Sequence, residues 1–198
     1  SSDLALMLFE TTGKLSYLNK SILFTDCILS NFSSENGGFY TNSDDHIDVI
    51  LKNIQYFDNV MPNANAVMIS IFSKINLITS DDKYIQAQKK LINNFLTKVS
   101  NQYFGISSFL KNSYLENYNQ LIIIAGKNKT QNEVVLDKVY KNYIDNIMVV
   151  MIDEKTQLDK GFKFYANISI NETTSIYVCK NNTCSLPFTN IDLLKEYL

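Results

Sequence analysis

The sequence has few cysteines and few charged residues, and each shortage excludes a class of protein. Three cysteines, Cys27, Cys179 and Cys184, do not make the disulfide framework of a small secreted domain, so we expect a reducing, cytoplasmic environment. Lysine and arginine number 18 against 20 acidic residues, and the net charge of -2 favours neither nucleic acid nor an anionic membrane as a partner. The longest apolar runs, 121–125 and 147–152, are strand-sized and too short to cross a membrane.

Histidine occurs once and proline twice, and their positions single out one part of the chain. The irregular segment 35–66 contains His46, Pro62 and the adjacent pair Gly37 and Gly38. A loop of this length inside a compact domain is usually functional or disordered, and its aromatic residues argue against disorder. We therefore expect the functional site in this segment.

The composition is sufficient for a sizeable core. The chain has 198 residues, of which 45% are hydrophobic, enough for one domain or for one domain with a small appendage. Apolar residues recur at helical spacing in five segments: 4–10, 15–32, 64–78, 80–103 and 106–118.

The helical segments alternate in character. Segment 64–78 is apolar on nearly every side, which predicts a buried helix, whereas 80–103 is amphipathic, with Asn93 and Asn94 on the face expected to meet water. Ser80 is the expected N-cap of the amphipathic helix. Paired buried and amphipathic helices are typical of the hairpins in helical toroids and solenoids.

The periodicity changes after residue 119. Apolar runs 121–125 and 147–152 predict buried strands, and 130–143 between them predicts a helix, which together indicate a parallel crossover. A last strand at 175–179 and a closing helix from about residue 190 complete the pattern, with Thr189 or Asn190 as its cap. The predicted fold is mainly α, with a small C-terminal α/β patch.

The triplet Asp44-Asp45-His46 is the first candidate site. Histidine changes charge near neutral pH, and an adjacent carboxylate can orient its ring, so His46 is a candidate general base. The same residues suit a solvated turn, because aspartate caps the segment that follows it. Together with Glu35 and Asp58 they also offer a glycosidase carboxylate pair, whose separation the sequence does not give.

The residues before the buried helix are the second candidate site. Asp58 and Asn59 lie just upstream, and Asn65 falls in its first turn, where free N–H groups bind anions or hydroxyl groups. Flat apolar faces that can stack on sugar rings or close a loop come from Phe39, Tyr40, Tyr56 and Phe57. The structural alternative is a proline-led helix start with capping amides.

Cys179 and Cys184 are separated by four residues. This spacing permits a strained disulfide or half of a thiolate metal site, but the chain has no second Cys/His pair to complete such a site. We expect two half-buried structural thiols, no metal and no cofactor.

Several of these stretches together resemble the C-terminal region of the thioredoxin-domain-containing, spermatogenesis-associated protein family. The matching stretches are Gly-Gly-Phe-Tyr at 37–40, Asp-Asp-His at 44–46, Phe-Asp-Asn at 57–59, Pro62 with Asn65, and the C-x-x-x-x-C-x-x-P ending within 177–189. The similarity spans nearly the whole chain.

The resemblance implies a fold and the place of a pocket. Residues 1–119 would be the helical-hairpin part of an (α/α) toroid, like those of N-acylglucosamine 2-epimerases and six-hairpin glycosidases, and 120–198 the α/β patch packed on it. Loop 35–66 would lie at the mouth of the toroid and bind a small, carbohydrate-like molecule. Asp58 and His46 would be the acid–base groups, and Phe39, Tyr40, Asp44, Asn59 and Asn65 the ligand-binding residues.

Whether the chain is an enzyme stays open at this point. An enzyme on this fold would resemble a sugar isomerase, an epimerase or a glycosidase, although epimerases use two histidines and this chain has one. The alternatives are a non-catalytic structural or interaction module and a redox accessory working through Cys179 and Cys184. Because a partial toroid would leave the flank of the buried helix 64–78 uncovered, we also expect a second polypeptide or self-association to cover it.

Overall fold

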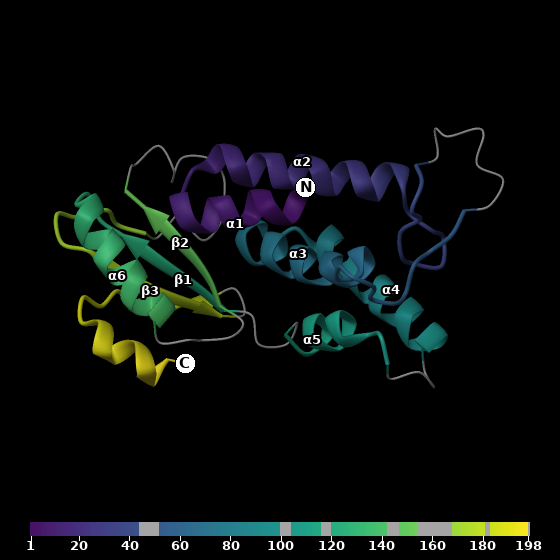
Figure 1. Ribbon diagram of the computed structural model, residues 1–198. Helices are drawn as coiled ribbons and strands as arrows, with labels where there is room; N and C mark the ends of the chain where they lie inside the picture. Colours follow the sequence, from purple (N-terminus) through teal and green to yellow (C-terminus); the bar gives the residue numbers. More distant parts are fainter. Residues whose placement is uncertain are drawn as a thin grey trace. The chain divides into compact units, whose positions relative to one another are not determined.

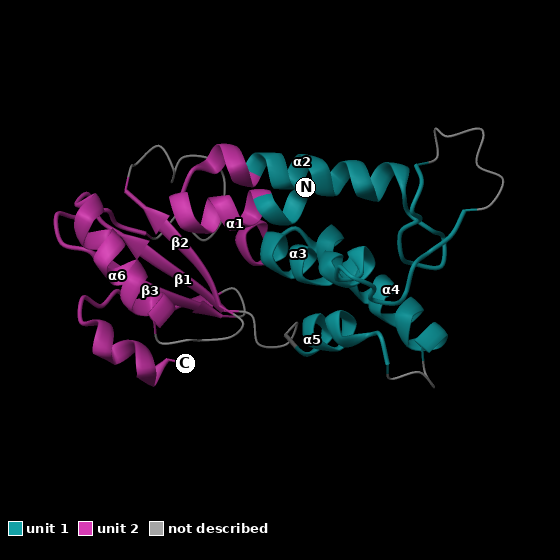
Figure 2. Cartoon of the chain, viewed as in Figure 1, with its two compact units in different colours: residues 1–4, 19–76, 81–118 teal, residues 5–18, 77–80, 119–198 magenta. Residues whose placement is uncertain are grey.

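The computed structural model describes residues 1–43, 52–99, 104–115, 120–141, 147–153, 168–180 and 183–197 (Figure 1). The chain divides into two compact units (Figure 2). The helical unit comprises Ser1–Leu4, Asn19–Asn76 and Asp81–Tyr118, and the sheet unit comprises Ala5–Leu18, Leu77–Ser80 and Asn119–Leu198. The division into 1–119 and 120–198 stays a prediction.

Helices dominate the first part of the chain, as predicted. Their bounds are α1 Ser2–Thr12, α2 Leu15–Asn31, α3 Ala64–Thr79, α4 Asp82–Val99 and α5 Ser107–Leu115. Gly13 ends α1 with a φ of 66°, and its N–H donates to the carbonyl of Phe9, as a C-terminal glycine does. Across the described ranges, no helix is both long enough and apolar enough to cross a lipid bilayer.

Helix α3 supplies much of the core of the helical unit. Its side chains Ile69, Phe72 and Ile75 are fully buried, which confirms the burial predicted from its apolar sequence. The uncovered flank expected for this helix is not seen, because Met68 and Ile71 are also buried. The most exposed apolar side chains of the helical unit lie instead in loops.

Helix α4 is amphipathic as predicted, with two corrections. Asn94 was expected to meet water but is 6% exposed, because loop residues pack over that part of the helix. Asp81, not Ser80, caps the helix: its carboxylate accepts a hydrogen bond from the N–H of Lys83 at 3.1 Å. Ser80 has a φ of 54°, outside the extended conformation of an N-cap residue.

The sheet unit contains a small mixed sheet with strand order β2-β1-β3-β4. Strands β1 (Gln120–Ala125) and β2 (Ile147–Ile152) pair in parallel, with helix α6 (Lys129–Lys141) between them in the chain. Strand β3 (Ser175–Lys180) pairs antiparallel with β1, and the short β4 (Thr183–Cys184) pairs antiparallel with β3. The predicted α/β patch is confirmed.

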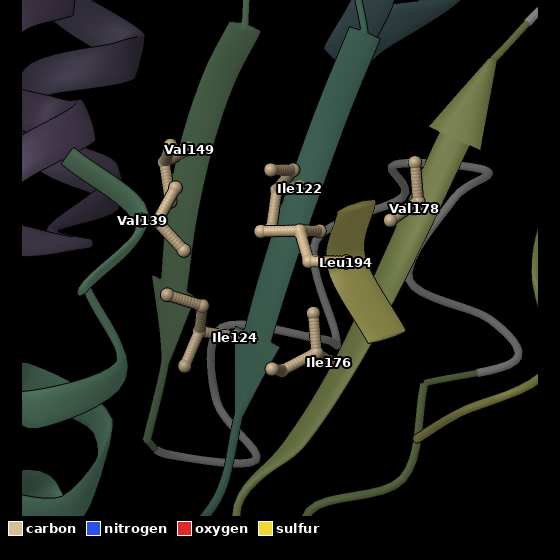
Figure 3. Packing of buried hydrophobic residues seen from close by; sticks show 7 residues of the cluster. All are labelled: Ile122, Ile124, Val139, Val149, Ile176, Val178 and Leu194. Atoms are coloured by element: carbon tan, nitrogen blue, oxygen red, sulfur yellow. The ribbon is translucent and has the colours of Figure 1, made fainter. Parts of the chain in front are cut away.

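One face of the sheet forms an apolar core, shown in Figure 3. Alternate residues of each strand point to this face, and side chains of α6 and of the 3-10 helix η4 (Ile191–Glu196) pack on it. The cluster consists of Ile122, Ile124, Val139, Val149, Ile176, Val178 and Leu194. Asn190, one of the two cap residues that the sequence predicted, caps η4 by accepting a hydrogen bond from the N–H of Asp192 at 3.0 Å.

The expectation of two free thiols at Cys179 and Cys184 is wrong. The two residues form a disulfide with an S–S distance of 2.02 Å. The sequence did not reveal strand β4, whose antiparallel pairing places Cys184 directly opposite Cys179 and brings their Cα atoms within 3.9 Å. Cys27 is a free, exposed cysteine.

Candidate functional site

The loop between α2 and α3 folds back on itself within the helical unit. Isolated bridges join Ser33 to Phe39 and Tyr40 to Ile54. Gly37, at the turn, has a φ of 90°, and a Cβ there would lie 2.4 Å from the carbonyl oxygen of Lys90. The Gly-Gly sequence is therefore needed because the backbone turns with a positive φ while pressed against α4.

The amide of Asn65 fastens this loop to α3. Its Oδ1 accepts a hydrogen bond from the N–H of Phe39 at 2.7 Å, and its Nδ2 donates to the carbonyl of Phe39 at 3.1 Å. Asn65 is 4% exposed. Because both atoms of the amide serve the backbone, this side chain braces the loop.

Asn63 forms the N-cap of α3. Its Oδ1 accepts from the N–H of Ala66 at 3.1 Å, and its Nδ2 donates to the carbonyls of Gln55 and Phe57. These bonds satisfy both the helix start and the incoming loop. The predicted structural role of the amides around Pro62 is thus present in the geometry.

Asp58 holds the starts of two helices. Its Oδ1 accepts a hydrogen bond from the N–H of Asn63 at 2.8 Å, before α3. Its Oδ2 accepts from the N–H of Ser108 at 2.9 Å and from the hydroxyl of Ser107 at 3.0 Å, at the start of α5. Burial alone raises the pKa of Asp58, but these hydrogen bonds outweigh it and lower the pKa below its usual 3.8.

A cavity of about 510 Å³ lies beside the loop, and we name it the Phe39 cavity. Most of its lining is apolar, from α2, α3 and the loop. The principal lining residues are Ile28, Phe32, Phe39, Tyr40, Thr41, Gln55, Asn65, Val67, Met68 and Ile71. The cavity thus brings together three residues that the sequence predicted to bind a ligand: Phe39, Tyr40 and Asn65.

The other predicted site residues do not join this group. Asp58 lies outside the cavity lining, and Asn59 is an exposed loop residue that is also outside it. His46 and Asp44 lie outside the described residues. The acid–base pair of Asp58 and His46 therefore stays a prediction.

A second cavity, of about 680 Å³, lies against α4, and we name it the Asn94 cavity. Its lining is rich in amides, lysines and hydroxyl groups: Ser34, Asn36, Tyr40, Lys52, Asn53, Ile54, Tyr56, Asn93, Asn94, Thr97 and Lys98. Of these residues, Tyr40 and Tyr56 were singled out from the sequence as aromatic residues of the loop. The available signal was the amide-rich end of α4, where Asn94 and Lys98 are one helical turn apart.

A hydrogen bond joins two residues of the Asn94 cavity lining, Tyr56 and Asn94. The Tyr56 hydroxyl donates to Oδ1 of Asn94 at 2.7 Å. Burial raises the pKa of Tyr56 above its usual 10.0, and the Coulombic effect of Tyr40 adds to this, while the bond to Asn94 partly offsets it. Tyr56 is therefore a neutral hydroxyl at physiological pH.

Comparison with known proteins gives one distant similarity. No family model matches the sequence. Over 96% of its length, the chain is 20% identical to spermatogenesis-associated protein 20 of Rattus norvegicus, and it spans 25% of that protein. This weak similarity agrees with the predicted resemblance to a spermatogenesis-associated protein, and the chain spans about a quarter of that relative's length.

Proposed function

We propose that the helical unit binds a small molecule in the Phe39 cavity. The observation that carries the proposal is a hollow of about 510 Å³ with mostly apolar walls. Ligand sites are typically clefts of roughly 300–1,000 Å³ with apolar walls and a few polar groups. The volume and the apolar walls of the Phe39 cavity fall within this range, so it can accept a small molecule.

The aromatic lining supports a ligand with a flat apolar face. Phe32, Phe39 and Tyr40 line the cavity, and such rings can stack on the C–H face of a sugar or on another ring. Thr41 and Gln55 add polar groups to the same lining. A carbohydrate-like molecule carrying an apolar substituent meets both requirements.

The geometry supports binding without catalysis. Both carboxylate oxygens of Asp58 accept hydrogen bonds at helix starts, and a carboxylate used in this way is held ionised. Among the described residues that line the cavity, Asp3 has the one carboxylate. We therefore place the acid–base roles predicted for Asp58 and His46 second to a binding role.

A titration of the whole chain with two glucosides tests the proposal. Phenyl β-glucoside should bind more tightly than methyl β-glucoside, because burying the phenyl ring contributes roughly 2 kcal/mol, or about 30-fold in affinity. Val67→Phe places a ring in the cavity and should abolish this preference. Val60→Phe is the matched control, since Val60 is 96% exposed and lies outside the lining.

The results can refute the proposal clearly. Equal affinity for the two glucosides, or equal loss in both Val→Phe variants, would show that the Phe39 cavity is not the site. A melting curve for each variant establishes that the fold is retained, because overfilling a packed region can cost about 1–3 kcal/mol.

As a second candidate function, we propose that the helical unit completes an (α/α) toroid together with a second polypeptide. Support comes from the exposed loop residues Val60, Met61 and Phe104, which are 96%, 76% and 94% exposed. Val60 and Met61 are adjacent in the chain, and an exposed apolar patch of sufficient area can serve as an interaction site. Light scattering tests self-association: a well-behaved monomer with a cooperative melt counts against it. The toroid proposal requires a second, helical polypeptide to bind the chain, and the absence of such binding counts against it.

A further inference from the structure

We propose that the Phe39 cavity selects ligands that carry a positively charged amino group beside an apolar ring, and that Asp3 pairs with this group. This proposal rests on the proposed function, to which it adds the charge of the ligand. Two observations support it: a half-buried carboxylate in the lining that has no partner among the described residues, and phenylalanine rings in the same lining.

A cluster of buried hydroxyl groups fixes the first turn of α1 beside the cavity. Ser2 is 3% exposed, and its Oγ lies 2.7 Å from the Oγ of Ser21 and 2.7 Å from the Oγ1 of Thr25, both on α2. The Ser2 hydroxyl also donates to the carbonyl of Ser21 at 3.0 Å. Because Ser2 and Asp3 both line the cavity, these bonds hold the backbone of Asp3 in place, which reduces the entropy lost when a ligand binds.

The carboxylate of Asp3 lacks a hydrogen-bond donor. Asp3 is half-buried, and its carboxylate forms no hydrogen bond or ion pair with any residue that the structure describes. An ionised carboxylate only accepts hydrogen bonds, and partial burial removes water that would otherwise donate them. No lysine or arginine belongs to the described lining, so the ligand has to supply the donors. An ammonium group supplies them and also neutralises the charge.

The aromatic rings of the lining favour the same charge. Phe32 and Phe39 both line the cavity, and the face of an aromatic ring attracts a cation that lies within about 6 Å of its centre. Tyr40 also lines the cavity, but the ammonium of Lys52 already lies 5.6 Å from the centre of that ring. A ligand cation would therefore contact the phenylalanine rings, while its apolar part packs on the apolar side chains that α3 contributes to the lining.

Calorimetric titration of the whole chain at neutral pH and low ionic strength tests this preference with three probes of similar size: phenethylammonium, phenethyl alcohol and hydrocinnamate. Ser1 also lines the cavity, so its α-amino group is acetylated, which leaves Asp3 as the charged residue of the described lining. We expect phenethylammonium to bind about tenfold more tightly than phenethyl alcohol, because a hydrogen bond to a charged group makes a contribution of this size. Hydrocinnamate should bind most weakly, because Asp3 repels its carboxylate.

Asp82→Asn is the matched control for Asp3→Asn. Both aspartates lie in the first turn of a helix, in α4 and α1 respectively, so each replacement removes the same charge from the same kind of position. Asp82 is exposed and lies outside the lining. Asp3→Asn should reduce the preference for phenethylammonium over phenethyl alcohol to about twofold or less, because the amide has no charge to pair with the ammonium. Asp82→Asn should retain the full preference, and a melting curve for each variant shows whether its fold is retained.

The results distinguish failure of this proposal from failure of the proposed function. Equal binding of phenethylammonium and phenethyl alcohol to the parent chain would overturn the role of Asp3 and leave the cavity as a site for uncharged ligands. A preference that persists in Asp3→Asn, or that is lost equally in Asp82→Asn, would overturn that role as well.

Val67→Phe and Val60→Phe locate the bound cation. Val67→Phe should abolish binding of phenethylammonium and Val60→Phe should leave it unchanged, so binding that survives Val67→Phe would overturn the proposal. Failure of all three probes to bind would also overturn it, and the titration with phenyl β-glucoside then decides separately whether the cavity is a ligand site.

Discussion

Replacing Asp58 tests whether one side chain stabilises the starts of two helices. Asp58→Ala removes the acceptor for Asn63 before α3 and for Ser107 and Ser108 at α5. Loss of a helix cap typically costs about 1 kcal/mol, and a hydrogen bond to a charged group contributes roughly 1.5–3 kcal/mol. For this half-buried residue with two caps, we expect a loss of about 2–3 kcal/mol.

Hydrogen exchange measured by mass spectrometry gives the local effect directly. Exchange in peptides covering α3 and α5 should accelerate by about 30- to 150-fold, because each 1.4 kcal/mol corresponds to a factor of ten. Asp58→Asn keeps one acceptor oxygen and should lose about half as much stability. Asn59, the exposed residue next to Asp58, supplies the control: Asn59→Ala should change stability by no more than about 0.5 kcal/mol. Unchanged exchange in α5 of Asp58→Ala would refute the double-cap argument.

The pH dependence of this effect has a definite sign. The pKa of Asp58 is lower in the folded chain than its usual 3.8, so the ionised form is favoured by folding. Its contribution is fully present above the unfolded pKa and is lost as the pH falls through the folded value. The stability difference between the parent chain and Asp58→Asn should therefore be constant near neutral pH and shrink in the acid range below about pH 4.

Four further variants probe the loop and the sheet. In a urea titration, Gly37→Ala should cost more than about 2 kcal/mol of stability, because its Cβ would lie 2.4 Å from a backbone oxygen. Gly38 also has a positive φ, but the atom nearest to its Cβ would be 3.5 Å away. Gly38→Ala should therefore cost only about 1 kcal/mol. Asn65→Leu leaves a buried N–H and carbonyl of the loop unpaired, so thermal unfolding should show a loss of about 3 kcal/mol, and a loss below 1 kcal/mol would contradict its bracing role. Replacing both Cys179 and Cys184 by serine should destabilise the sheet unit by about 2 kcal/mol, as expected for the loss of a disulfide that closes a short loop. Dithiothreitol should then have no further effect on the melting curve of this variant.

Periodicity in the sequence was sufficient to predict most elements. The apolar run 64–78 corresponds to α3 at Ala64–Thr79, and the runs at 121–125 and 147–152 correspond to β1 and β2. These elements are buried, so hydrophobicity alone determines where they lie. Strand β4 was missed because its two residues, Thr183 and Cys184, are too few to show any period. The disulfide was misjudged for the same reason.

The candidate site was only partly predictable. Aromatic residues near paired glycines singled out Phe39 and Tyr40, which the structure places in the lining of the Phe39 cavity, and their binding role stays a prediction. The second cavity was missed because it depends on residues far apart in the chain, such as Asn36, Tyr56 and Asn94. The outward position predicted for Asn94 followed from helical phase alone, which takes no account of a loop folded over the helix.

The most direct test of a small-molecule site in the helical unit is an NMR measurement of nuclear Overhauser effects between phenyl β-glucoside and the methyl groups of the labelled protein. Binding in the Phe39 cavity predicts contacts from the phenyl protons to Val67, Met68 and Ile71, which line it. Contacts confined to the exposed Val60 and Met61, or no contacts at saturating glucoside, would contradict the account.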